Sequence, residues 1–213
     1  MVKQISDLRN EYLPSPLDEK SVDADPFTQF SSWFEDAIRA EIDEPNAMVL
    51  STADLAGNVS ARVVLLKGAD KNGFVFFSNY QSRKGMQLAE NPRAALTFHW
   101  HIIRRQIRVE GKVRKVSRKE SIAYFNSRPL DHRVSSCVSP QSTVIPDRAF
   151  LEAMHKGFML DLGGSPLACP EQWGGYLLKP TLVEFWQGRA GRLHDRLMYH
   201  LVGKKWVLER LAP

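Results

Sequence analysis

Cationic side chains recur in short segments at the predicted ends of strands and helices, where they could bind anionic groups. The segment ARVVLLKG places Arg62 and Lys67 five residues apart, so an unbent strand would point them to opposite faces. The segment NYQSRKG places Ser82, Arg83 and Lys84 at a predicted helix N-terminus, where free backbone N–H groups and the helix dipole favour anions. This pattern is typical of a phosphate site, although a solvated surface turn explains it equally well.

Two further segments offer hydrogen-bond donors of the same kind. Tyr124 and Arg128, in AYFNSRP, are four residues apart and would share one face of a helix. Gln141 and Ser142 supply an amide and a hydroxyl in the segment SPQST. The first pair could bind a second anion or could pack against its neighbours, and the residues alone do not decide between these interpretations.

The segment RLHDR, at residues 192–196, brackets a histidine with two arginines. Arg192, His194 and Arg196 alternate with Leu193 and Asp195, so in an extended strand the first three would point to one face. This alternation predicts that the three side chains face one cavity. A charged strand end at the surface is the simpler alternative.

Several common site patterns are missing from the sequence. It contains no GxGxxG, GxxxxGK[ST], GxSxG or HExxH motif, and Cys137 and Cys169 lack metal-site spacing, so we expect no bound metal. Two cysteines in 213 residues suit a reducing compartment. No secretory signal is recognisable, and no apolar run approaches the roughly 18 residues of a membrane span. We therefore expect a cytoplasmic protein with no membrane partner.

The charge balance is basic, with a net charge of +5 and a pI of about 9.3, which raises the alternative of a nucleic-acid-binding β-barrel. Such a barrel would interleave exposed aromatic residues with cations. Trp33, Phe34, Phe76 and Phe185 instead fall in apolar runs and are expected in the core. We therefore expect no nucleic-acid partner.

The predicted elements are mostly strands. A polar arm covers residues 1–24, and one domain covers residues 25–213. Asp25 and Pro26 predict the start of a helix over 26–38, Ser82 one over 83–91, and the Ser117–Glu120 capping box one over 118–127. A loop is expected over 130–146 and a helix over 147–158. Strands are expected at 46–54, 59–67, 74–79, 93–101, 105–116, 176–188, 195–202 and 204–211, and a turn at 68–73.

Short hairpin connections and the lack of long crossovers favour a mainly β, α+β fold, in which helices flank an antiparallel barrel. The order of the sequence segments is also similar to that of a known family. ARVVLLKG, FFSNYQSRKG, NPRAALTF, RQIRVEGKV, YFNSRP, VSPQSTVIPDR, WGGY, EFWQGRAGRLHDR and RLAP occur in this order. In this the chain resembles the pyridoxine/pyridoxamine 5'-phosphate oxidase family from about Arg9 to Pro213.

The resemblance implies an FMN-binding split β-barrel that works as a homodimer, with FMN at the subunit interface. It implies oxidation of pyridoxamine 5'-phosphate or pyridoxine 5'-phosphate to pyridoxal 5'-phosphate in vitamin B6 metabolism. O2 is the acceptor and yields H2O2, and the amine substrate also releases NH3. Neither the preference between the two substrates nor a second product site follows from the residues.

The resemblance also implies where the ligands bind. The implied FMN residues are Arg62, Val63, Val64, Leu65, Leu66, Lys67, Phe77, Ser78, Arg83, Lys84, Gln106, Gln141, Ser142, Trp186 and Arg196. The implied substrate residues are Lys67, Tyr124, Arg128, His132, Arg192 and His194, with Arg9 and Tyr12 on an N-terminal lid. Arg192 and His194 are the implied catalytic pair, which orients the substrate and manages charge.

Two positions depart from the family pattern after SRP. His132 replaces a serine that normally helps to bind the substrate phosphate, although a histidine can still donate a hydrogen bond there. Ser135 replaces a glycine, which would restrict the loop if that position needs a positive φ. The alternative function is therefore a flavin- or pyridoxal-phosphate-binding split barrel with weak or altered oxidase activity.

Overall fold

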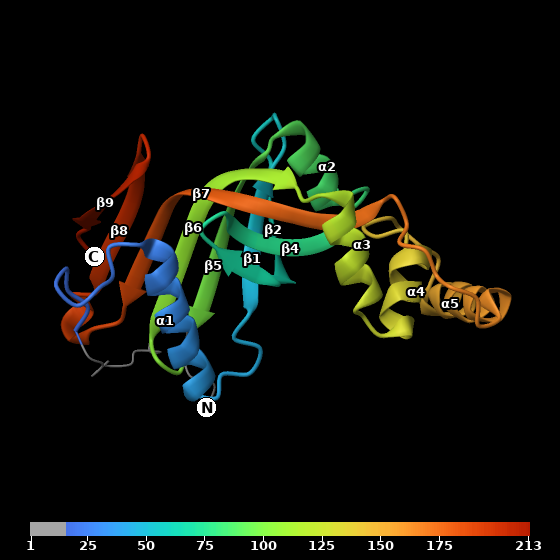
Figure 1. Cartoon of the computed structure of the whole chain (residues 1–213), viewed down its shortest axis with the longest axis horizontal. Coiled ribbons are helices and arrows are strands. Elements are labelled where there is room, and N and C mark those ends of the chain that lie inside the picture. Colours follow the sequence, from blue (N-terminus) through green and yellow to red (C-terminus); the bar gives the residue numbers. More distant parts are fainter. Residues whose placement is uncertain (1–15) are drawn as a thin grey trace, which may run out of the picture. The chain divides into compact units, whose positions relative to one another are not determined.

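The computed structural model describes residues 16–213, which form a nine-stranded sheet with flanking helices (Figure 1). The hydrogen-bonded order is β2-β1-β5-β6-β7-β4-β3, and β8 pairs with both β7 and β9. The strands are β1 Ala47–Ala53, β2 Val59–Leu65, β3 Gly68–Asp70, β4 Gly73–Asn79, β5 Arg93–Trp100, β6 Arg105–Lys115, β7 Trp173–Gln187, β8 Asp195–Val202 and β9 Lys205–Arg210. The helices are α1 Pro26–Arg39, α2 Arg83–Glu90, α3 Arg118–Asn126, α4 Leu130–Val138, α5 Arg148–Leu162 and the 3-10 turn η2 Ala190–Arg192.

The mainly β fold with flanking helices is confirmed. The chain divides into two compact units. Unit 1 comprises Ala95–Glu110, Pro180–Pro213 and the described part of Met1–Val49, and unit 2 comprises Leu50–Ala94 and Gly111–Lys179. No helix among residues 16–213 is long and apolar enough to cross a membrane.

Unit 1 has an aromatic core beneath α1. Asp25 caps this helix by accepting a hydrogen bond from the Phe27 backbone N–H at 3.1 Å, and Pro26 stands at its first position, as predicted. The core-facing side of the helix packs Phe30 on Phe98 at 5.2 Å and Trp33 on Phe185 at 5.1 Å between ring centroids. Burial of these large rings stabilises the α1 end of the unit.

The C-terminal hairpin of unit 1, formed by β8 and β9, binds the chain near Leu17 through hydrogen bonds. Strand β8 pairs antiparallel with β7 and β9, with Trp186 opposite Arg196 and Leu197 opposite Arg210. The Leu17 backbone N–H donates to an Asp195 carboxylate oxygen at 3.1 Å, and Arg210 donates to the Leu17 carbonyl at 3.1 Å. The chain at Leu17 is thus held against β8 and β9.

Unit 2 is built on β4 and the first half of β7, which pair antiparallel with Phe76 opposite Tyr176. Two glycines in WGGY allow this strand to pack closely, because a Cβ at Gly174 would lie 2.1 Å from the Tyr80 hydroxyl oxygen. The turn expected at 68–73 begins with a short strand, β3, which pairs with β4. In Figure 1, α4 and α5 lie side by side at one end of this unit.

Candidate functional site

A cavity of about 880 Å³ opens within unit 2. Its walls come from β2, β4, the N-terminus of α2, the end of α3, helix α4 and the loop after it. The lining residues are Ser60, Ala61, Arg62, Val63, Val64, Leu65, Lys67, Phe77, Ser78, Asn79, Arg83, Lys84, Tyr124, Arg128, His132, Ser135, Ser136, Ser139, Gln141, Ser142 and Trp173. The cationic segments of unit 2 identified in the sequence therefore meet in one place.

Arg62 is anchored by neutral oxygens on the β2 wall. Its Nη1 donates to the Thr52 hydroxyl at 2.7 Å and to the Leu50 carbonyl at 3.2 Å. Burial lowers the pKa of Arg62, and the nearby Arg83 lowers it further. Arg62 and Lys67 do not lie in one unbent strand, because β2 ends at Leu65, and both residues line the cavity.

The N-terminus of α2 carries the second group of cations. Ser82 caps the helix, with its hydroxyl accepting from the Gly85 N–H at 3.3 Å. Lys84 is only 9% exposed, and its Nζ donates to Ser82 Oγ at 3.3 Å and to Gln141 Oε1 at 3.0 Å. Burial, reinforced by Arg62, lowers the pKa of Lys84 to about 8. The solvated-turn alternative is therefore wrong for Lys84, whereas Arg83 is exposed at the cavity wall.

The cavity cations share one property, which is that none of them has an acidic partner. Within residues 16–213, no carboxylate lies within 4.0 Å of the charged nitrogens of Arg62, Lys67, Arg83, Lys84 or Arg128. Unpaired charges that are partly buried are costly, and a ligand phosphate would satisfy them with charge-assisted hydrogen bonds. The arrangement fits a cavity for phosphorylated ligands.

An aromatic wall closes the other side of the cavity. Phe77 stacks on Tyr124 with 4.0 Å between ring centroids, and on Trp173 at 5.4 Å. The guanidinium of Arg128 lies 4.8 Å from the centre of the Trp173 ring. Arg128 follows the end of α3 at Asn126 rather than lying within the helix, yet it lines the cavity together with Tyr124, as expected.

The loop expected over 130–146 is partly wrong, because Leu130–Val138 form helix α4. Pro129 precedes the first turn, and Val134 and Val138 bury one side of the helix at a spacing of four residues. Ser135 lies in this helix and has no positive φ, so replacing a glycine there imposes no backbone strain. His132 also lines the cavity, as expected.

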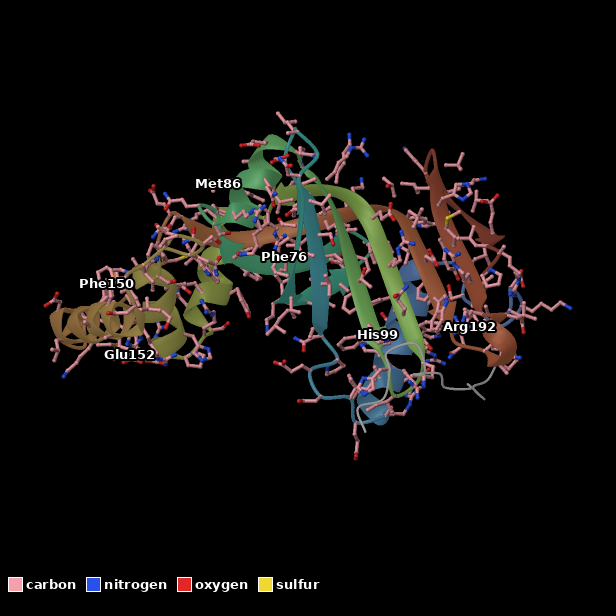
Figure 2. All side chains as sticks on the ribbon, turned by 180° about the vertical axis from the view of Figure 1, so that it is seen from behind. Phe76, Met86, His99, Phe150, Glu152 and Arg192 are labelled. Carbon is pink, nitrogen blue, oxygen red and sulfur yellow. The ribbon has the colours of Figure 1, made fainter. Side chains whose placement is uncertain are left out.

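Unit 1 holds the expected catalytic pair, Arg192 and His194, in a turn rather than in a strand. Arg192, which is labelled in Figure 2, ends the 3-10 turn η2. Its φ is 62°, and β8 begins only at Asp195. The predicted strand alternation from Arg192 to Arg196 is therefore wrong. His194 Nδ1 accepts a hydrogen bond from the Arg189 N–H at 3.1 Å, and its ring lies 4.7 Å from that of Trp186.

Arg196 is fixed by a buried carboxylate in the same unit. Its Nε donates to Glu184 Oε1 at 2.8 Å and its Nη1 to the Ala212 carbonyl at 2.8 Å. The hydrogen bond to Glu184 raises the pKa of Arg196. Gln106 lies near the start of β6 and is half-buried. These residues and Trp186 do not line the unit 2 cavity.

The remaining expectations have mixed outcomes. Leu66 is buried and does not line the cavity, whereas the other expected residues of unit 2 do. Arg9 and Tyr12 lie outside the described residues. Ser60, Ala61, Asn79, Ser136, Ser139 and Trp173 were not expected. The sequence contains a pattern that could have predicted two of them. His132, Ser135, Ser136 and Ser139 have the spacing of one helix face. No group of His, Cys, Asp and Glu side chains within residues 16–213 is arranged to hold a metal ion.

Comparisons with known proteins show which family the chain matches. The family model described as Pyridoxamine 5'-phosphate oxidase matches residues 34–157, and the model described as Pyridoxine 5'-phosphate oxidase C-terminal dimerisation region matches residues 173–213. The pyridoxine/pyridoxamine 5'-phosphate oxidase of Polynucleobacter asymbioticus is 54% identical over 209 residues, which cover 98% of this chain and 99% of that protein. The enzyme of the same name from Paraburkholderia phymatum is 52% identical over 210 residues, covering 98% and 99%.

Two solved structures are also similar. PhzG from Burkholderia lata 383, in complex with tetrahydrophenazine-1-carboxylic acid, has a TM-score of 0.88 and 30% identity, covering 94% of this chain and 99% of that one. A pyridoxamine 5'-phosphate oxidase-related, FMN binding protein from Nostoc punctiforme has a TM-score of 0.70 and 18% identity, covering 89% and 98%. The second likeness supports the fold alone.

Proposed function

The chain belongs to the pyridoxamine 5'-phosphate oxidase family, and from this we propose that it oxidises pyridoxamine 5'-phosphate and pyridoxine 5'-phosphate to pyridoxal 5'-phosphate. The amine, O2 and water give the aldehyde, NH3 and H2O2, and the alcohol and O2 give the aldehyde and H2O2. The observation that carries this function is the cavity of unit 2, whose cations lack acidic partners and which is large enough for phosphorylated ligands.

FMN is the proposed cofactor, and when bound it supplies the redox chemistry by accepting hydride from the substrate. Arg62, Arg83 and Lys84 bind its phosphate, because they combine two guanidiniums, a buried ammonium and a helix N-terminus. Ser78 and Gln141 are already joined by a hydrogen bond of 3.2 Å, which fixes the amide at the cavity wall. The other proposed contacts are Val63, Val64, Leu65, Leu66, Lys67, Phe77, Gln106, Ser142, Trp186 and Arg196.

The substrate phosphate binds at the aromatic end of the same cavity. Arg128 and Tyr124 donate to the phosphate oxygens, and Lys67 and His132 contribute further polar contacts. Arg192 and His194 orient the pyridine ring and stabilise its charge. The Arg189 N–H donates to Nδ1 of His194, which fixes the orientation of the imidazole ring.

Two copies of the chain are proposed to form a homodimer with FMN at their interface. The match of residues 173–213 to a dimerisation region supports this assembly. The domain is proposed to span residues 25–213, and the arm 1–24 to carry a lid with Arg9 and Tyr12. Mixing an Arg62→Ala variant with an Arg196→Ala variant tests the interface: recovered FMN binding indicates shared sites, and no recovery argues that each chain forms its own site.

One experiment tests the function as a whole. The purified protein is reconstituted with FMN, its visible spectrum is recorded, and pyridoxal 5'-phosphate is followed after addition of pyridoxamine 5'-phosphate in air. We expect a yellow protein that turns over and forms H2O2. A yellow protein without turnover would instead support the flavin-binding alternative, and a protein that takes up no FMN would contradict both.

A further inference from the structure

Arg128 is held in place entirely by neutral groups. Its Nη1 donates to the Ser136 hydroxyl at 2.8 Å, and its guanidinium lies 4.8 Å from the centre of the Trp173 ring. The Arg128 side chain makes no other hydrogen bond and no ion pair within residues 16–213. Two fixed contacts therefore leave most of its N–H groups available for an anion.

Ser136 can serve Arg128 only as an acceptor, because its single proton is already used. The Ser136 hydroxyl donates to the His132 carbonyl one turn earlier in α4, at 3.0 Å. Its lone pairs then face the guanidinium, so that donor and acceptor roles form a fixed chain from the α4 backbone to Arg128. A carboxylate at this position would also fix the arginine, but it would neutralise the charge that the phosphate needs.

The register of α4 places this hydroxyl at the cavity. His132, Ser135, Ser136 and Ser139 line the cavity at helical spacing, while Val134 and Val138 are buried. We propose that Ser136 is a positioning residue, which holds the Arg128 guanidinium at the Trp173 ring so that its free N–H groups face the substrate phosphate. This inference rests on the proposed role of Arg128 as a phosphate ligand.

The test is steady-state kinetics of the FMN-loaded enzyme with pyridoxamine 5'-phosphate. We expect Ser136→Ala to raise KM by roughly tenfold, near the lower end of the effect of a lost hydrogen bond to a charged group, with kcat and the Kd for FMN nearly unchanged. Ser136→Thr keeps the hydroxyl and should restore most of the affinity. Ser31→Ala is the matched control, because Ser31 makes the same bond to a carbonyl one turn earlier, at 3.0 Å, and contacts no guanidinium.

A double-mutant cycle with Arg128→Ala separates the possible outcomes. We expect Arg128→Ala to raise KM more than Ser136→Ala does, and the double variant to be no worse than Arg128→Ala. If Arg128→Ala leaves KM unchanged, the proposed phosphate role of Arg128 is wrong. If Arg128→Ala raises KM while Ser136→Ala does not, or if the two effects multiply, Ser136 does not act through Arg128. A Ser136→Thr variant that folds but stays as impaired as Ser136→Ala also overturns the proposal.

Discussion

Arginines on the strands of unit 1 and those of the unit 2 cavity differ in their partners. Three strand arginines of unit 1 are matched by acids: Arg105 Nη1 lies 2.6 Å from Asp36, Arg196 Nε lies 2.8 Å from Glu184, and Arg210 Nε lies 2.8 Å from Glu19. In unit 2 the cations of the cavity have no acid within ion-pair distance, as described above. The charge of arginine is therefore neutralised by carboxylates at these positions of unit 1, whereas the cavity arginines of unit 2 lack a carboxylate partner within residues 16–213.

The difference shows what a structure gains and loses by leaving charges unpaired. A matched pair restrains two segments and needs no ligand, whereas a buried cation without a partner is desolvated at a cost to folding. Lys84 is the cavity cation for which this cost is expected, because it is buried and burial lowers its pKa. Removing a charge should therefore destabilise unit 1 but stabilise the ligand-free cavity of unit 2.

The largest expected effect is on Glu184, which joins two arginines. Its side chain is only 4% exposed, and its carboxylate accepts from Arg196 at 2.8 Å and from Arg108 at 3.1 Å. Glu184→Gln leaves Arg196 without a counter-charge and Arg108 with Glu110 alone, so the free energy of unfolding should fall by about 2–3 kcal/mol. The loss is less than for a fully buried pair because both arginines reach solvent. Chemical denaturation of the apoprotein at fixed concentration measures this change.

Glu110 is the matched control for that substitution. It also accepts from Arg108, at 2.6 Å, but its side chain is 42% exposed. Glu110→Gln should therefore lower the free energy of unfolding by less than about 1 kcal/mol. Equal losses in the two variants would show that burial of Glu184 does not set its contribution.

The next prediction concerns unit 2, where removing a charge should raise the stability of the apoprotein rather than lower it. Lys84→Met keeps the apolar stem but removes the ammonium, so FMN affinity should fall about 30-fold through loss of a charge-assisted contact. The apoprotein should become more stable by about 1 kcal/mol, because a desolvated charge is gone. Flavin fluorescence titration measures the first change and denaturation of the apoprotein the second.

Lys67→Met supplies the comparison within the same cavity. Lys67 lines the cavity but is exposed, so its removal should leave the stability of the apoprotein unchanged. If Lys84→Met destabilises the apoprotein as a lost ion pair would, then Lys84 has a structural role and the contrast between the units fails.

A smaller effect should appear as a dependence of FMN affinity on pH. Burial lowers the pKa of Lys84 to about 8, and a bound phosphate would raise it again by stabilising the ammonium. Affinity is then full well below pH 8 and falls as the pH rises through 8, by about tenfold between pH 7 and pH 9. The phosphate, with a second pKa near 6, stays dianionic over this range. Titrations at the two pH values test this, and a slope that persists in Lys84→Met would assign it to another group.

The sequence was most informative where the signal is local. The Asp25 and Ser82 caps and the Ser117–Glu120 capping box each set a helix start, because the cap bonds its own first turn. Helix α4 was missed since its register is fixed by tertiary burial of two valines. The pairing of Arg196 with Glu184 joins neighbouring strands, β8 and β7, and no pattern in either segment reveals it.

The sequence identified the cations of the cavity, but it did not predict that they lack carboxylate partners. Arg62, Lys84 and Arg128 lie in three segments, and only the fold shows that no acid accompanies them. Arg192 was misplaced because Gly191, with φ 64°, turns the chain just before the strand begins. Strand parity can be applied only after the first residue of the strand is known.

The smallest expected effect lies on α5, where charges are paired but exposed. Arg148 Nε lies 2.6 Å from Glu152, with side chains 89% and 62% exposed, and Glu152 projects from the helix in Figure 2. Glu152→Gln should change the free energy of unfolding by only about 0.3 kcal/mol, because water already solvates both charges and salt screens them. Denaturation at low and high ionic strength measures it. A loss near that of Glu184→Gln would mean that pairing itself, rather than burial of the pair, decides what an acid contributes here.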